Sequence, residues 1–132
     1  MTDIYTCRAK RIDNNEWTHG FIISYVVGGN PIIVYQASID DYEKVDIDYH
    51  EVLRETICRY TNLKDRNGRT IIEGDILEGM DESSTNKKLY EVIYINNGFY
   101  YKDTDDFYWL PDNVKGEEVI GNIIDNEELL WL

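Results

Sequence analysis

Short apolar runs alternate with polar turns along the chain, which is the pattern of β-strands. The first three runs are residues 4–12, 17–27 and 32–37. Asp13-Asn14-Asn15-Glu16 and Gly28-Gly29-Asn30-Pro31 separate them. Asn, Asp and Gly supply the backbone conformations that tight turns need. The pattern predicts an antiparallel β-meander at the N-terminal end.

Residues 38–56 leave two interpretations open. Residues 51–57 could form about two helical turns, and short apolar runs do not decide such cases. A strand is favoured just before them, because apolar side chains alternate with polar ones: Val45, Ile47 and Tyr49 against Asp46, Asp48 and His50.

After residue 57 the strand pattern is clearer, and Asn67-Gly68 predicts a hairpin turn. Residues 79–88 are polar and predict a mobile loop, and Asn96-Asn97-Gly98 predicts another hairpin. Residues 125–128 are typical of a short terminal helix. The predicted strands are 57–61, 70–72, one starting at 76, 89–95, 99–102, 107–110 and 119–124.

Charge narrows the possible partners. The 132 residues carry 13 basic and 26 acidic side chains, for a net charge of −13. Residues 73–132 hold 15 of the acidic and only 4 of the basic side chains. Such a balance argues against binding duplex nucleic acid or anionic lipid, because both need a basic face.

The compartment is inferred from what the sequence lacks. Two cysteines, Cys7 and Cys58, do not form a disulfide framework, and the N-terminus does not read as a signal peptide. Residues 17–39 carry no Asp, Glu, Lys or Arg, but the Gly-Gly-Asn-Pro turn interrupts them. We expect no membrane association and a cytoplasmic location.

The segment RYTNLKDRNGRTIIEGDIL, Arg59 to Leu77, is similar to the central signature of the YopX family of phage and prophage proteins. The segment EVIGNIIDNEELL, Glu118 to Leu130, is similar to its closing segment, and CRAKRIDNNEWTHGFI, Cys7 to Ile22, to one of its N-terminal variants. Asn62 stands where the family often has Gly; Asn is the next best residue for positive φ, so the turn expected there should survive. Glu127 stands where the family usually has Pro.

The resemblance implies an all-β fold whose C-terminal part is a small SH3-like β-barrel. It also implies a phage or prophage origin, hence the cytoplasm of a bacterial host, and self-association. It brings no known activity and no catalytic residues. Together with the strand pattern it predicts an N-terminal meander over residues 1–56 and a barrel over 57–132, or one continuous domain.

Candidate chemical sites are weak. Cys7, His19, His50 and Cys58 lack the close ligand pairs of structural zinc sites. Residues 103–106 bring three aspartates together but lack the other features of a calcium loop. No nucleophile motif, phosphate loop or dinucleotide fingerprint is present. We therefore predict no catalytic, cofactor-binding or metal-binding residues.

Two interaction surfaces are predicted. The first is basic and aromatic, a combination that can clamp phosphates and stack bases, although four solvated charges on a hairpin tip are the stronger explanation. The second is an apolar C-terminal tail that either closes its own domain or contacts a second subunit. The basic surface comprises Arg59, Tyr60, Lys64, Arg66 and Arg69, and the tail comprises Leu129, Leu130, Trp131 and Leu132.

These features predict a non-enzymatic phage or prophage accessory protein that acts through protein contacts as a homo-oligomer, with a protein partner that the sequence does not name. An alternative is an acidic mimic of nucleic acid that blocks a host DNA-binding protein, because rows of carboxylates can imitate phosphates. A weaker alternative is single-strand binding through the basic surface.

Overall fold

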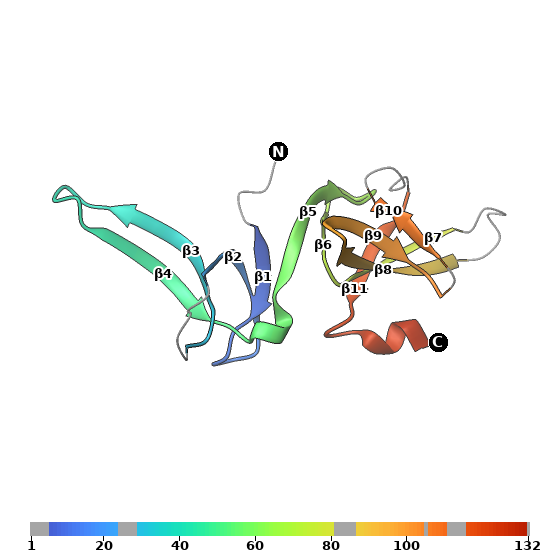
Figure 1. Ribbon diagram of the computed structural model, residues 1–132, viewed down its shortest axis with the longest axis horizontal. Coiled ribbons are helices and arrows are strands. Elements are labelled where there is room, and N and C mark those ends of the chain that lie inside the picture. The colour runs from blue at the N-terminus through green and yellow to red at the C-terminus, as the bar shows by residue number, and fades with distance from the viewer. Residues whose placement is uncertain (1–5, 24–28, 81–86, 105, 111–115, 132) are drawn as a thin grey trace. The chain divides into compact units, whose positions relative to one another are not determined.

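The computed structural model describes residues 6–23, 29–80, 87–104, 106–110 and 116–131 (Figure 1). Contacts within the chain divide it into two compact units, residues 1–60 and 61–132, and the division falls inside β5. The described chain is all-β, as the sequence predicts. Its strands are β1 Cys7–Lys10, β2 Trp17–Ile23, β3 Ile32–Ile39, β4 Val45–Glu51, β5 Cys58–Lys64, β6 Thr70–Ile72, β7 Asp75–Met80, β8 Lys87–Ile95, β9 Gly98–Lys102, β10 Phe107–Trp109 and β11 Glu118–Asn122.

In the N-terminal unit, β1 to β4 pair antiparallel in chain order. The strand order of the first sheet is β4-β3-β2-β1-β5-β6, so β4 lies at one end. A small core packs against this sheet, and its buried members are Cys7, Ala9, Ile33 and Val52. Gly20 allows β2 to approach β3 closely, because a Cβ at this position would lie 2.3 Å from the carbonyl oxygen of Val34.

The hairpin of β3 and β4 extends beyond this core (Figure 1). All of residues 35–49 are exposed, and we call them the hairpin arm. The arm begins at a β-bulge, because the pairing shifts between Val34, opposite Tyr49, and Gln36, opposite Asp48. Tyr35, the extra residue, stacks its ring on His50 with centroids 4.8 Å apart.

In the C-terminal unit, five antiparallel strands follow the order β10-β9-β8-β7-β11. The core is aromatic: the rings of Tyr90 and Tyr101 meet edge to face with centroids 4.7 Å apart, and Tyr108 packs on both. Burial is the main cause that raises the pKa of each of these three phenols. The buried members of this core are Ile71, Leu77, Tyr90, Val92, Tyr101, Leu110 and Val119.

A closed barrel is not confirmed. Among the described residues, β10 pairs only with β9 and β11 only with β7, so the sheet has two ends. The predicted 79–88 loop is too long, because β7 continues to Met80 and β8 already starts at Lys87; the remaining residues, 81–86, lie outside the described chain. The short terminal helix is a 3₁₀-helix, η2, over Glu127–Trp131.

The ambiguous stretch 38–56 contains more strand than helix. It contains the end of β3, all of β4 and one short 3₁₀-helix, η1, over Arg54–Thr56. Asn62 has the positive φ that the sequence predicts, +65°, but it lies inside β5 rather than in a turn. In the β8–β9 hairpin, Asn96 and Asn97 are the residues with positive φ.

Candidate functional site

The predicted basic surface divides between the two units. Arg59 and Tyr60 belong to the N-terminal unit, whereas Lys64, Arg66 and Arg69 belong to the C-terminal one. Arg59 is exposed on β5, and the Tyr60 hydroxyl lies 2.5 Å from Nδ1 of His19. The two rings meet edge to face, so Tyr60 is held by its own unit.

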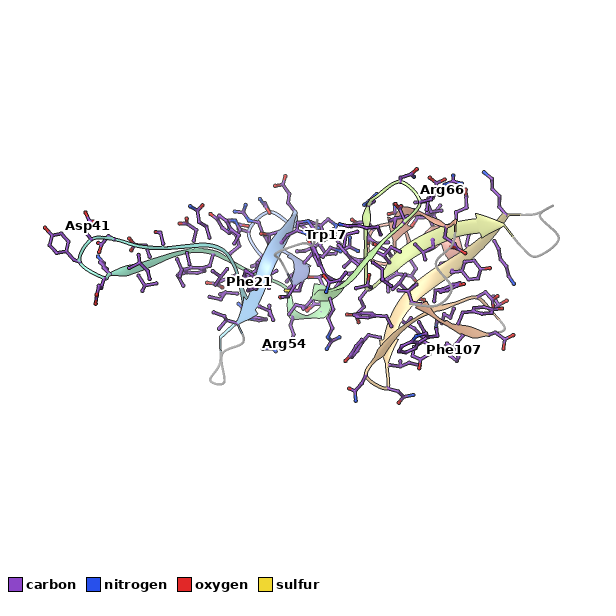
Figure 2. All side chains as sticks on the ribbon, turned by 90° about the horizontal axis from the view of Figure 1, so that it is seen from above. Trp17, Phe21, Asp41, Arg54, Arg66 and Phe107 are labelled. Carbon is purple, nitrogen blue, oxygen red and sulfur yellow. The ribbon has the colours of Figure 1, made fainter. Side chains whose placement is uncertain are left out.

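The other three basic residues are exposed on the β5–β6 hairpin. Lys64 Nζ donates to Thr70 Oγ1 at 2.7 Å, and Arg66 forms an ion pair with Glu118 at 2.8 Å. Figure 2 labels Arg66 on this hairpin. Exposed pairs of this kind contribute little to stability, but they lower the positive charge that the hairpin offers to a phosphate. The assignment of a recognition surface here stays a prediction.

A buried carboxylate, Asp65, holds this hairpin in place. Its side chain is 6% exposed, and its Oδ1 accepts the N–H groups of Asn67 and Arg69, each at 2.9 Å. Its Oδ2 accepts the N–H of Val119 on β11, also at 2.9 Å. Burial by itself would raise the pKa of Asp65, but these backbone donors outweigh it, so the pKa is lowered. The hairpin's central charge is therefore structural.

The C-terminal tail is partly covered by its own unit. Leu129 and Leu130 are half-buried and line a groove of about 540 Å³ together with Leu89. Lys88 lies on the same groove and forms an ion pair with Asp103 at 2.8 Å. The Trp131 side chain and Leu132 lie outside the described residues. The tail's place at a subunit contact stays a prediction.

Four acidic side chains of the C-terminal unit form ion pairs with cations. Besides the pairs of Glu118 and Asp103, Lys87 pairs with Glu78 at 3.4 Å and Lys102 with Glu91 at 3.9 Å. These ion pairs neutralise part of the acidic charge on the surface of this unit.

The hairpin arm is a surface that sequence reasoning missed. Exposed fractions of its apolar side chains reach 92% for Tyr42, 69% for Ile39 and 60% for Val45. Ile39 lies opposite Val45, and Ala37 lies opposite Ile47, so both strands contribute to one apolar face. Exposed contiguous apolar surface on a small protein commonly marks an interaction site. Alternation in 45–49 was the available signal, but it does not tell which face is covered.

The candidate metal ligands do not cluster. Among the described residues, no group of three or more His, Cys, Asp or Glu side chains could hold a metal ion. Cys7 and Cys58 are buried free thiols, and burial raises the pKa of Cys7. In the acidic turn, Asp103 Oδ1 accepts the backbone N–H of Asp106 at 2.8 Å; Asp105 lies outside the described residues.

We expect EDTA to leave the melting temperature of the protein unchanged. A bound ion would stabilise the folded state by mass action, so its removal would lower the melting temperature. Differential scanning calorimetry with and without EDTA measures this directly. A drop of several degrees that added zinc or calcium reverses would contradict the prediction.

Comparison with models of protein families shows to which family the chain is related. The family model described as YopX protein matches residues 8–131. The chain belongs to the YopX family. This match confirms the resemblance seen in three segments of the sequence. The description of the YopX family names no activity.

A solved structure extends the comparison to the fold. The crystal structure of protein EF1440 from Enterococcus faecalis is 25% identical in sequence and superposes with a TM-score of 0.66. The match covers 96% of this YopX-family chain and 98% of the other. No curated protein matches. Within the described residues, no helix has the length and apolar character that crossing a bilayer requires.

Proposed function

We propose that this YopX-family protein is a non-enzymatic accessory protein of a phage or an integrated prophage, and that it acts through protein–protein contacts in the bacterial cytoplasm. The observation that carries this proposal is the exposed apolar face of the hairpin arm. A partner protein that covered this face would remove the apolar side chains from water, which is the main source of free energy in most protein association.

Affinity capture tests the proposal. The full chain is immobilised, exposed to lysate of a host bacterium, and each captured protein is then purified and tested for direct binding to the chain. We expect at least one purified protein to bind with a defined stoichiometry. Failure of every captured protein to bind directly, together with turnover of a substrate by the chain, would overturn the proposal.

We further propose that the protein is a homo-oligomer with the C-terminal tail near the subunit contact. Light scattering compares the full chain with a chain that ends at Asn126, at low and at high salt. We expect the full chain to be oligomeric, and more so at high salt, because salt screens the repulsion between two strongly acidic bodies. A monomer in every sample would show that the tail only completes its own unit.

The two alternatives involving nucleic acid lack a supporting observation. Glu78, Glu91 and Glu118 are held in ion pairs, which neutralise three of the carboxylates that an acidic mimic would present. The five residues proposed for single-strand binding belong to two units, and Arg66 is already paired. We therefore propose protein contact as the function.

We expect no measurable binding to duplex DNA at physiological salt. Affinity for duplex DNA comes mainly from cations that displace counterions from phosphates, and the net charge of −13 opposes this. Fluorescence anisotropy of a labelled duplex is the measurement. Binding that weakens steeply with salt, and is lost on replacing Arg59, Arg66 and Arg69 by alanine, would contradict it.

A further inference from the structure

Strand β4 leaves one edge of its sheet open. It is the last strand in the order β4-β3-β2-β1-β5-β6, and it pairs with β3 on one side. On the other side, the described chain meets it only at its end, where the N–H of Ile12 donates to the carbonyl oxygen of Glu51 at 3.0 Å. The edge from Val45 to Tyr49 is therefore a template for another strand.

Side chains along this edge alternate between two kinds. Val45, Ile47 and Tyr49 point to one face and are 60%, 43% and 50% exposed. Asp46 and Asp48 point to the opposite face and are also exposed, as is the tip of the arm, where Asp41 is labelled (Figure 2). Each face of the edge thus has a single chemical character, because successive side chains of a strand point to opposite faces.

Charge decides which kind of strand fits the edge. The arm carries five acidic side chains and one basic side chain, Lys44. A second copy of β4 would place Asp46 and Asp48 opposite the same aspartates, and like charges directly across a strand pair are destabilising. A strand with basic side chains on that face would instead form opposite-charge pairs.

We propose that the open edge of β4 binds an extended segment of a partner protein in which apolar and basic side chains alternate. Main-chain hydrogen bonds would add this segment to the sheet as a new strand. Its apolar side chains would lie beside Val45, Ile47 and Tyr49, and its lysines or arginines beside Asp46 and Asp48. The inference rests on the proposed function and names the partner's binding segment.

A cavity lies where the open edge ends. It has a volume of about 340 Å³ and is lined by Ile12 and Tyr49, by the acidic Asp13 and Glu51, and by His50. A long basic side chain fits this lining, because its aliphatic stem packs on apolar surface while its charged end meets a carboxylate. The cavity would therefore receive the side chain that follows the paired residues of the added strand.

A synthetic peptide tests the proposal on the full chain. The probe is an end-capped peptide that alternates valine and lysine and is long enough to pair from Val45 to Tyr49. A peptide of the same composition, with its valines and lysines in two blocks, is the control. We expect the alternating peptide to bind at least about tenfold more tightly in fluorescence anisotropy, the equivalent of about 1.4 kcal/mol. Equal binding of both peptides would overturn the proposal.

Charge reversal on the strand gives the matched comparison. The double variant Asp46→Lys, Asp48→Lys should lose at least about tenfold in affinity for the valine–lysine peptide, and should bind an alternating valine–glutamate peptide instead. The control, Glu127→Lys with Glu128→Lys, makes the same change in net charge on exposed residues of the C-terminal unit and should bind like the wild type. Equal losses in both variants would mean that only net charge matters.

A second variant tests the proposal even if charge reversal disturbs the fold of the arm. Ile47→Thr leaves the net charge unchanged, and threonine, like isoleucine, favours strands. This substitution should weaken peptide binding severalfold. Hydrogen exchange then shows where the peptide binds: among residues 45–49, the amides that face away from β3 should become protected. Unchanged exchange there would overturn strand addition. Protection that instead rises with protein concentration, without peptide, would mean that a second copy occupies the edge.

A failure of the β4 assignment can be distinguished from a failure of the proposed function. If a purified partner from the affinity capture binds the Asp46→Lys, Asp48→Lys variant as tightly as the wild type, the partner contacts another surface. In that case the assignment of β4 fails, whereas action through protein contacts stands.

Discussion

Replacing Asp65 by asparagine is expected to lower the free energy of unfolding of the C-terminal unit by about 2 kcal/mol. The asparagine keeps one acceptor oxygen for the N–H groups of Asn67 and Arg69. Its NH₂ group then faces the N–H of Val119, so a buried donor loses its acceptor. Chemical denaturation, followed through the hydrogen exchange of β11 amides, measures the loss.

The effect should also depend on pH. Because the pKa of Asp65 is lower in the folded protein, the carboxylate contributes stability above its unfolded pKa, about 3.9, and this is lost as the pH falls through the lower folded value. The free energies of unfolding of the wild type and of Asp65→Asn should therefore become equal at acid pH. Asp106→Asn, at an exposed carboxylate of the same unit, is the control. A constant difference down to the most acid pH would contradict the assignment.

Truncating Leu77 to alanine should lower the free energy of unfolding of the same unit by about 3 kcal/mol. Leu77 is fully buried on the interior strand β7, between Tyr90 on β8 and Val119 on β11. The loss combines the removal of buried apolar atoms with the cavity left behind, since strands on both sides limit collapse. Denaturant titration of both proteins gives the difference.

Ile39→Ala is the matched control for Leu77→Ala. Ile39 is also a branched apolar residue in a strand, but it is 69% exposed on the hairpin arm. Substitution there should change stability by less than about 0.5 kcal/mol, as is usual at exposed positions. If the two variants were equally destabilised, the Ile39 side chain would be packed in solution, which would contradict the exposed arm.

Local backbone chemistry explains what the sequence predicted well. The bounds of β6, Thr70–Ile72, are those expected from an apolar run between turns. The β8–β9 hairpin forms where expected because Asn96 and Asn97 tolerate positive φ. Asn62 shows the limit of the same reasoning: its conformation was predictable, but its position within a strand depends on the pairing partners of β5.

Pairing between strand edges and cover of exposed faces could not be predicted. Closure of a barrel depends on whether β10, at one end of the sheet, pairs with β11, at the other end, and the sequence pattern of a strand does not tell which other strand lies at its edge. Likewise, the alternation from Val45 to Tyr49 indicates a strand with one apolar face, but burial of that face depends on what else packs there. That is why the C-terminal tail, apolar at every position, attracted attention in the sequence, whereas the more exposed hairpin arm did not.

The packed tyrosines of the C-terminal core provide an intrinsic optical signal for the unfolding of this unit at alkaline pH. Burial raises the pKa of Tyr90, Tyr101 and Tyr108, so the fold favours their neutral form. Above the unfolded pKa of about 10, this preference favours unfolding, because each phenol ionises more readily once it is solvated. The ultraviolet absorbance of tyrosinate should then rise in a cooperative step, and this change can be followed without an added label.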